Sequence, residues 1–471
     1  MSSTPRPSRF WAATFAGAAV ALAGCAHGSG ASRDEPTLAA EQACAGFNAL
    51  AVFDQEPLPE NALARGQSFY CLGLYAASVT VLTDHAIGKP VSVALDEAIK
   101  SSETPPLADD RVPALRWLVY VHRRFPGWER INDAVGEVAR ADLERPELAD
   151  VRDDLHALAA RFEYQKGRFA KAVELLRMIP ATSPVHAEAV LLEGAIDVRV
   201  ESPLEALVAF DEVLRAIPAG ADPKRARERD LAVISIARVQ YAMGQLEAAG
   251  RNYDSLPPSS TYWAAAALEG AWTRYKLNDL PGALARRRTL AARSDEVPIE
   301  MMAEATALEA MIAVHDKHPE ATDAIIKRFN DVYPIVFTEA RKLALRETGA
   351  LYELAFTVRA GRALPPPFGT GPMKVLLADP PLARRFEEVD EIRREEARLQ
   401  ALDQRLRASR VGQEAREALG LRRTSAESEA GEQFRRSLQR LAGALGEQIK
   451  QIIKVEYESL QARRSEDGLI P

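Results

Sequence analysis

The side chains best able to do chemistry lie apart along the chain and form no established catalytic motif. His315 and His318 are one helical turn apart, but their spacing differs from the HExxH zinc motif, and no cysteine or third ligand accompanies them. We therefore interpret them as solvated surface histidines rather than metal ligands. Gly369 and Gly371 do not form a phosphate loop, because no Lys-Ser/Thr pair follows them and no strand is expected before them.

The acidic residues do not indicate a catalytic pair either. Glu387, Glu388, Asp390 and Glu391 alternate with arginines, as on a solvated helix face, and the G-x-S-x-G motif is absent. We expect no enzyme activity, no cofactor and no metal. The charge also argues against nucleic acid as a ligand, since the formal net charge is -7 and such binders need a basic surface.

The N-terminus carries the strongest local signal. Arg6 and Arg9 precede an apolar run over residues 10–23, which is shorter than the roughly 20 residues that span a bilayer. The run ends in Leu22-Ala23-Gly24-Cys25. A short apolar segment behind a basic start is typical of a secretory leader.

This pattern resembles a bacterial lipoprotein signal peptide. The resemblance implies that residues 1–24 are removed and that Cys25 carries lipid, with Ala26 rather than Asp after the cysteine implying the periplasmic side of the outer membrane. The alternative is an ordinary leader that happens to contain a cysteine. Residues 25–36 are small and polar, so we expect a lipidated flexible tether.

Two cysteines remain beyond the lipidation site. Cys44 and Cys71 would both reach an oxidising compartment, so we expect a disulfide between them, the alternative being two buried thiols. In the chain-entropy view such a bridge contributes about 3 to 4 kcal/mol.

The elements that position these residues are expected to be helices. Ala, Leu, Arg and Glu dominate the composition and aromatic residues reach only 7%. A self-similarity of about 34 residues occurs twice. Ala172, Leu176 and Pro184 recur as Ala206, Phe210 and Pro218, and Ala237, Tyr241, Leu246 and Ala249 recur as Ala271, Tyr275, Leu280 and Ala283.

These spacings resemble the tetratricopeptide repeat, a helix-turn-helix unit. The resemblance implies an all-α fold in which residues 37–360 form a superhelix of helical hairpins. Recognisable units cover 59–92, 153–186, 187–220, 230–263 and 264–297, and divergent hairpins cover 93–152 and 298–360. The alternative is an unrelated helical bundle.

The C-terminal part differs in composition. We expect a Pro/Gly-rich linker over 361–383, a charged, coiled-coil-like helical hairpin over 384–464 with its arms separated from Gly420 to Ser428, and a tail over 465–471. Apolar residues at alternating steps of four and three support the arms, with Gln448 filling the one polar position of the second arm. They are Ile392, Leu399, Leu402 and Leu406, then Phe434, Leu438, Leu441, Leu445, Ile452 and Val455. Helices folded back onto the repeats are an equally good interpretation.

The repeat resemblance places a binding groove on the concave face, lined by the first helix of each unit. The residues expected there are Arg161, Tyr164, Gln165, Arg199, Arg238, Tyr241, Trp272, Tyr275 and Lys276. Arginines and aromatics suit an extended acidic peptide or a free C-terminal carboxylate. The alternative is that the tyrosines are half-buried packing residues and that the arginines are solvated.

These observations predict an outer-membrane-anchored periplasmic scaffold that binds envelope proteins for assembly, motility or secretion. Its partners would be proteins, reached through the repeat face and through the C-terminal helices, and the membrane, reached through the lipid. The alternatives are a peptidoglycan- or glycan-associated protein or regulator of a peptidoglycan synthase, and a structural spacer.

Overall fold

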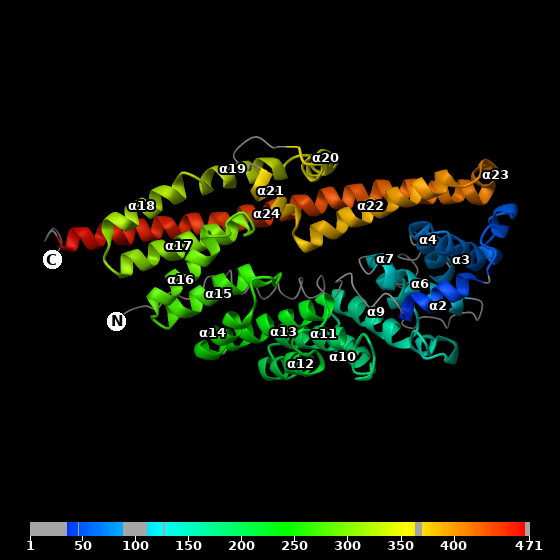
Figure 1. Ribbon diagram of the computed structural model, residues 1–471, viewed down its shortest axis with the longest axis horizontal. Coiled ribbons are helices and arrows are strands. Elements are labelled where there is room, and N and C mark those ends of the chain that lie inside the picture. Colours follow the sequence, from blue (N-terminus) through cyan, green and yellow to red (C-terminus); the bar gives the residue numbers. More distant parts are fainter. Residues whose placement is uncertain (1–34, 46, 88–110, 126–127, 363–369, 467–471) are drawn as a thin grey trace. The chain divides into compact units, whose positions relative to one another are not determined.

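A computed structural model describes residues 35–45, 47–87, 111–125, 128–362 and 370–466 of the chain. Within these residues every regular element is a helix and no strand occurs, which confirms the prediction of an all-α chain (Figure 1). The leader and Cys25 lie outside the described residues, as do most of the tether and parts of the expected linker and tail; residues 35 and 36 of the tether and 465 and 466 of the tail belong to helices.

The described chain forms two compact units. Ala19–Glu228 and Arg384–Ala426 contribute to one, here the first unit; Arg229–Ala383 and Glu427–Pro471 contribute to the other, here the second unit. The boundaries fall inside helices, and each unit combines one long segment, N-terminal in the first unit and central in the second, with a separate C-terminal segment.

The first unit consists mainly of pairs of consecutive helices. Three of these pairs pack closely: α3 with α4, α9 with α10 and α11 with α12. They fall, to within one residue, inside the predicted repeat units 59–92, 153–186 and 187–220. The helices are α2 Glu35–Ala45, α3 Ala62–Cys71, α4 Tyr75–Ile87, α6 Val112–Arg124, α7 Glu129–Gly136, α8 Arg140–Leu143, α9 Arg152–Gln165, α10 Phe169–Leu176, α11 His186–Arg199 and α12 Pro203–Ala216. Single 3-10 turns, Ala51–Asp54, Pro59–Asn61 and Pro146–Leu148, lie between them.

The second unit also consists mainly of consecutive helices that pack on each other. It begins within α13 Pro223–Ala242, whose residues up to Glu228 belong to the first unit. α14 packs on α15, α15 on α16 and α17 on α18. Its helices are α14 Leu246–Ser255, α15 Trp263–Lys276, α16 Leu280–Ala291, α17 Ile299–His315, α18 Pro319–Asn330, α19 Tyr333–Ala344, α20 Thr348–Arg359 and α21 Thr370–Leu377. Small residues such as Ala271 and Ala283 are fully buried where these helices meet.

The turns inside the hairpins repeat in conformation as well as in sequence. Gly167 and Gly244 have φ of 73° and 79°, in the left-handed region where glycine is favoured. Thirty-four positions later in the chain, Glu201 and Asn278 take the same conformation, with φ of 60° and 61°, although they carry a Cβ. The hairpin geometry is therefore kept where the glycine is absent.

The C-terminal segment departs from the predicted division. α22 Pro380–Ala401 is followed by the short α23 Gln404–Ala408, and then by α24 Arg410–Glu466, a single helix of 57 residues. The prediction that the arms separate from Gly420 to Ser428 is therefore wrong, since those residues lie inside α24.

The chain turns instead between two local caps. The Asp403 side chain accepts a hydrogen bond from the Arg405 amide at 2.8 Å, and the Ser409 hydroxyl accepts one from the Gly412 amide at 3.1 Å. Side-chain caps of this kind satisfy amides that a helix start leaves free. A helix tolerates a glycine such as Gly420 at a cost of about 1 kcal/mol, which packing elsewhere along α24 offsets.

The predicted linker is also shorter than expected. Residues 361–383 were expected to be irregular, but α21 begins at Thr370 and α22 at Pro380. Prolines in a first helical turn lose no hydrogen bond, so Pro372 and Pro380 are compatible with helix starts.

Within the first unit, the C-terminal segment packs on the N-terminal helices. Both carboxylate oxygens of Glu395 accept a hydrogen bond from the Ala76 amide at 2.9 Å, in the first turn of α4. Arg398 donates to the Gly73 carbonyl at 2.6 Å, and Arg65 pairs with Glu414 at 2.9 Å. α22 and α24 are themselves joined by ion pairs such as Arg423–Glu396 at 2.9 Å.

In the second unit, the remainder of α24 lies against α17 and α18 (Figure 1). Gln451 donates a hydrogen bond to the Met311 sulfur at 3.3 Å, and Arg463 pairs with Asp323. The apolar positions predicted for this arm are buried, from Phe434 at 0% exposed to Val455 at 0%. These contacts favour the interpretation that the C-terminal helices fold back onto the hairpins.

Candidate binding surface

The predicted groove residues lie on the first helices of the hairpins. α9 carries Arg161, Tyr164 and Gln165, and α11 carries Arg199; both helices belong to the first unit. Arg238, Tyr241, Trp272, Tyr275 and Lys276 are on α13 and α15 in the second unit. Each group is therefore considered within its own unit.

Arg161 is not available to a partner. Its side chain is buried, its guanidinium forms an ion pair with Glu188 of α11, and Nη1 lies 3.2 Å from Nε2 of His122 on α6. Burial lowers the pKa of Arg161 to about 10. Burial, and then the charge of Arg161, hold the pKa of His122 well below its ordinary value, so a neutral imidazole can accept from the guanidinium.

Arg238 is engaged in the same way in the second unit. Nε and Nη2 both donate to the carboxylate of Glu269 on α15, at distances between 2.7 and 3.2 Å. Burial acts to lower the pKa of Arg238, but the adjacent Glu269 charge outweighs it and raises the pKa. The prediction that Arg161 and Arg238 line an open groove is wrong, because each is paired with a glutamate of a neighbouring helix, the half-buried Glu188 and the buried Glu269.

Trp272 also has a partner on the next first helix. Its indole Nε1 donates to Oε1 of Glu304 on α17 at 2.7 Å, and its ring meets Tyr275 edge to face at 5.9 Å. Burial raises the pKa of Glu304 to about 7; the hydrogen bond from Trp272 acts against this shift, and the charge of Glu269 adds to it.

These contacts belong to one periodic arrangement, which we call the inter-helix ladder. Each step joins a donor on one first helix to a carboxylate on the next first helix of the same unit. The steps are Arg123–Asp154, Arg161–Glu188, Arg238–Glu269 and Trp272–Glu304. A buried pair of this kind fixes the relative position of two helices, because either partner alone would leave an uncompensated polar group.

Sequence reasoning missed the ladder, although a signal was present. Each carboxylate follows its donor by 27 to 32 positions, a little less than one repeat. An acid at that distance from a first-helix arginine could have been recognised as its partner in the next hairpin.

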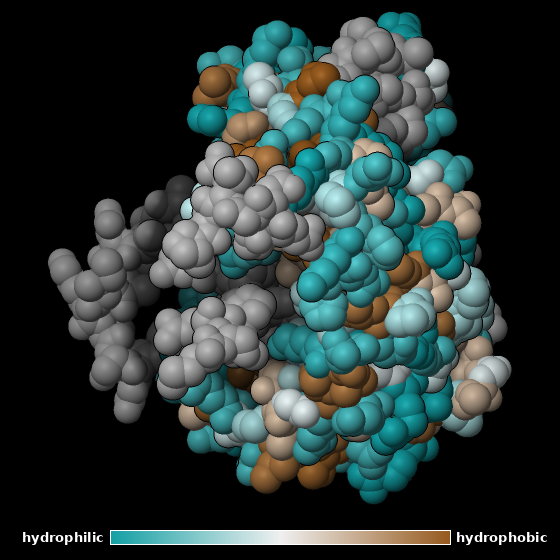
Figure 2. Space-filling model, turned by 90° about the vertical axis from the view of Figure 1, so that its left-hand side faces the viewer, coloured by the Kyte–Doolittle hydropathy of each residue, from teal (hydrophilic) through white to brown (hydrophobic). Residues whose placement is uncertain are grey.

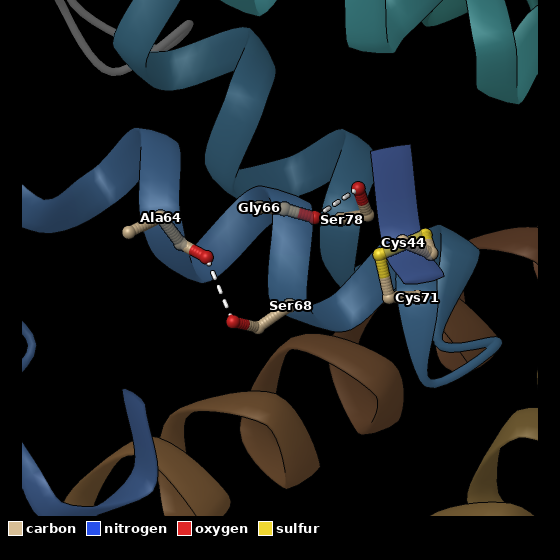
Figure 3. The surroundings of a disulfide bond; sticks show 6 residues. All are labelled: Cys44, Ala64, Gly66, Ser68, Cys71 and Ser78. Atoms are coloured by element: carbon tan, nitrogen blue, oxygen red, sulfur yellow. Dashed lines mark hydrogen bonds between the residues drawn. A yellow bond between two sulfur atoms is a disulfide. The ribbon is translucent and has the colours of Figure 1, made fainter. Parts of the chain in front are cut away.

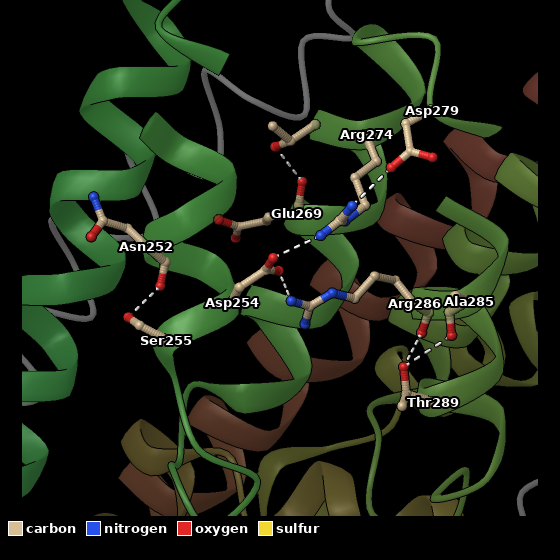
Figure 4. A network of polar contacts seen from close by, with 10 residues as sticks. Asn252, Asp254, Ser255, Glu269, Arg274, Asp279, Ala285, Arg286 and Thr289 are labelled. Carbon is tan, nitrogen blue, oxygen red and sulfur yellow. Dashed lines mark hydrogen bonds and ion pairs between the residues drawn. The ribbon is translucent and has the colours of Figure 1, made fainter. Parts of the chain in front are cut away.

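A second polar network ties α14, α15 and α16 together (Figure 4). Asp254 accepts from Arg274 at 2.7 Å and also pairs with Arg286. Arg274 reaches Asp279 at 2.8 Å, and the other oxygen of Asp279 accepts from the Gly282 amide at 2.9 Å, capping α16. The carboxylates in Figure 4 therefore hold neighbouring helices together.

The remaining groove residues differ in accessibility. Gln165 and Arg199 are exposed, whereas Tyr164 is half-buried with its ring 5.7 Å from that of Phe169. Tyr241 is buried, and burial followed by Glu269 and Glu304 raises its pKa.

The end of α15 is more open than its centre. Lys276 is exposed, with its Nζ 4.3 Å from the centre of the Tyr241 ring. Tyr275 is half-buried, and burial followed by the charge of Glu458 on α24 raises its pKa. The tyrosines thus fit the packing interpretation, while Gln165, Arg199 and Lys276 stay accessible.

The two cysteines beyond the leader are bonded to each other and join α2 to α3 (Figure 3). The Cα atoms of Cys44 and Cys71 are 5.5 Å apart. Beside the bridge, the Ser68 hydroxyl donates to the Ala64 carbonyl at 2.8 Å and the Ser78 hydroxyl to the Gly66 carbonyl at 2.7 Å. Nearby hydroxyls are therefore satisfied by backbone carbonyls.

No cluster of three or more metal-ligating side chains occurs in the described part of the chain. His315 lies 3.5 Å from the Asp316 carboxylate, and His318 immediately precedes α18. Among the described helices, none combines the length and the apolar composition that crossing a membrane requires. No protein-family model matches the chain, and no curated protein matches it.

Proposed function

We propose that the chain is a scaffold that binds other envelope proteins, held at the periplasmic face of the outer membrane by lipid on Cys25. The leader ending in Leu22-Ala23-Gly24-Cys25 supports the anchor. The observation that carries the scaffold is the recurrence of left-handed turns one repeat apart, at Gly167 and Glu201 and at Gly244 and Asn278. Repeated hairpins present extended surfaces to protein partners.

The arrangement we propose for the hairpins is tetratricopeptide-like. Two observations support it: consecutive helices pair, and the inter-helix ladder links first helices within each unit. A ladder of buried pairs makes the surface rigid before a partner arrives, which reduces the ordering cost of binding.

The contact residues we propose are those that the ladder leaves accessible. In the second unit they are the exposed Lys276 and the half-buried Tyr275. In the first unit they are Arg199 and Gln165. Both sets carry positive charge on a chain of formal net charge -7, which suits an acidic segment of a protein partner.

The anchor is tested by metabolic labelling with an alkyne fatty acid. We expect label on the wild-type protein, and on Cys25→Ser neither label nor processing. A processed wild-type protein without label would refute the anchor and leave the binding surface untouched.

The surface is tested by crosslinking intact envelopes and recovering the protein with its partners. Lys276→Glu should reduce the recovery of at least one partner about tenfold, since an exposed cation is replaced by an anion. The matched control is Lys327→Glu, an exposed lysine on the second helix of its hairpin. Equal recovery with both variants, with circular dichroism unchanged, would exclude this surface.

A further inference from the structure

The C-terminal end of α24 has two apolar faces. One face, with Ile452 and Val455, is buried in the second unit. The other exposes Ile453, Tyr457 and Leu460, whose relative exposures are 60%, 60% and 49%. Scattered exposed apolar residues are ordinary, but three on one helix face form a patch of the kind that marks an interaction site.

The spacing of these residues makes a continuous line. Steps of four and three positions keep side chains on one face of a helix with 3.6 residues per turn. Ile449, half-buried, extends the line by one turn toward the N-terminus. We call Ile449, Ile453, Tyr457 and Leu460 the α24 stripe.

The charges around the α24 stripe identify the kind of occupant. Lys450 and Lys454 lie along its N-terminal half, and Glu456 and Glu458 along its C-terminal half; all four are exposed. The two acids would repel an anionic lipid surface. A peptide whose charges all have the same sign would be repelled by one half of the α24 stripe. A helix with the reversed order of charges fits, and an antiparallel copy of α24 has that order.

We propose that the α24 stripe is an interface between two copies of this chain, paired antiparallel about a two-fold axis near Glu456. Such an interface is isologous, so each contact occurs twice. In this register Ile453 of one copy fits between Tyr457 and Leu460 of the other, and Lys454 faces Glu458.

The same geometry brings one unfavourable pair together. On a helix of 3.6 residues per turn, Lys454 and Glu458 border the α24 stripe on one side and Glu456 borders it on the other. In an antiparallel pair, equal sides face each other. The two Glu456 carboxylates therefore meet across the axis and repel, while the two Lys454–Glu458 contacts attract.

The attractive and the repulsive contact can be tested by the same substitution, glutamate to glutamine, at two positions. Sedimentation velocity of the full chain in a mild detergent, over a range of concentrations, should show a monomer–dimer equilibrium. Glu458→Gln should raise the dissociation constant about three- to tenfold, and Glu456→Gln should lower it. Equal shifts in one direction would overturn the proposed register.

The apolar contact is tested separately. Ile453→Asp should raise the dissociation constant more than tenfold, because it places two charges in the centre of the interface. Leu421→Asp is the matched control, since Leu421 is 75% exposed on the same helix in the first unit. A chain that stays monomeric at about 100 μM, or a dimer insensitive to Ile453→Asp, would overturn the proposal.

Mixed variants distinguish contacts between copies from the Lys454–Glu458 pair within one helix, whose charged atoms are 3.7 Å apart. Lys454→Glu and Glu458→Lys should each weaken self-association through like charges. Mixing the two variants should restore association, because both contacts between positions 454 and 458 then join opposite charges. Failure of the mixture to associate better than either variant alone would exclude charge pairing between copies.

Discussion

Glu304 offers a quantitative test of the inter-helix ladder. Its carboxyl group is buried on α17 and accepts one hydrogen bond from the Trp272 indole at 2.7 Å. Burial raises its pKa from 4.5 to about 7. Glu304→Gln preserves an acceptor for the indole and removes the ionisable group, so it isolates the effect of the charge.

The sign follows from proton linkage. The folded state binds a proton on Glu304 more tightly than the unfolded state, so this group's stabilisation is complete below pH 4.5 and is lost as the pH rises to about 7. A shift of this size corresponds to about 3 kcal/mol. Glu304→Gln should therefore be more stable than wild type by up to about 3 kcal/mol at pH 8, and the two should differ little at pH 4.5.

The assay is chemical denaturation of both proteins between pH 4.5 and 8, followed by tryptophan fluorescence. Only the difference in unfolding free energy between the two proteins is interpreted, because other groups also titrate in this range. One is Asp197, whose pKa is raised to about 6 by burial and then by the charge of Glu193. Native-state fluorescence of Trp272 should titrate near pH 7 in wild type and lose that transition in Glu304→Gln. A constant difference in unfolding free energy across the pH range would refute the reasoning.

Three further outcomes are expected. Arg238→Ala should lower the free energy of unfolding by about 3 kcal/mol, because it leaves the buried Glu269 carboxylate without its arginine. Lys276→Ala should change the free energy of unfolding by less than about 0.5 kcal/mol. Urea denaturation measures both values. Glu201→Gly should raise the melting temperature, since relief of its positive φ is worth about 1 kcal/mol, and unchanged melting would count against that conformation. Replacing Cys44 and Cys71 by serine should cost about 3 kcal/mol, measured against wild type without reductant.

Much of the fold was predictable because it depends on local pattern. Helix content and the hairpins follow from composition and from small residues at fixed spacing, and the turns at Gly167 and Gly244 lie between paired helices. The continuation of α24 through Gly420 was not predictable from the glycine alone. A glycine costs a helix about 1 kcal/mol, and the caps at Asp403 and Ser409 place the turn earlier.

The candidate surface was less predictable because exposure depends on the neighbouring hairpin. Repeat columns placed Arg161 and Arg238 on first helices, which is where they lie. Whether these arginines can contact a partner depends on Glu188 and Glu269, which are distant in sequence and neutralise the two guanidinium charges. A single sequence therefore indicates which face of a helix a residue occupies more readily than it indicates which side chain of the neighbouring hairpin that residue contacts.

The hydrogen bonds from the Ala76 amide to Glu395 join residues 319 positions apart in sequence. For a chain that crosses a membrane from its N-terminus onward, this contact sets an order of events. The helices near the N-terminus emerge first, but the start of α4 lacks its glutamate cap until most of the polypeptide has followed. Closing so long a loop is slow and entropically costly. The early helices therefore stay incomplete until most of the chain has emerged, the interval in which a chaperone or protease would encounter them.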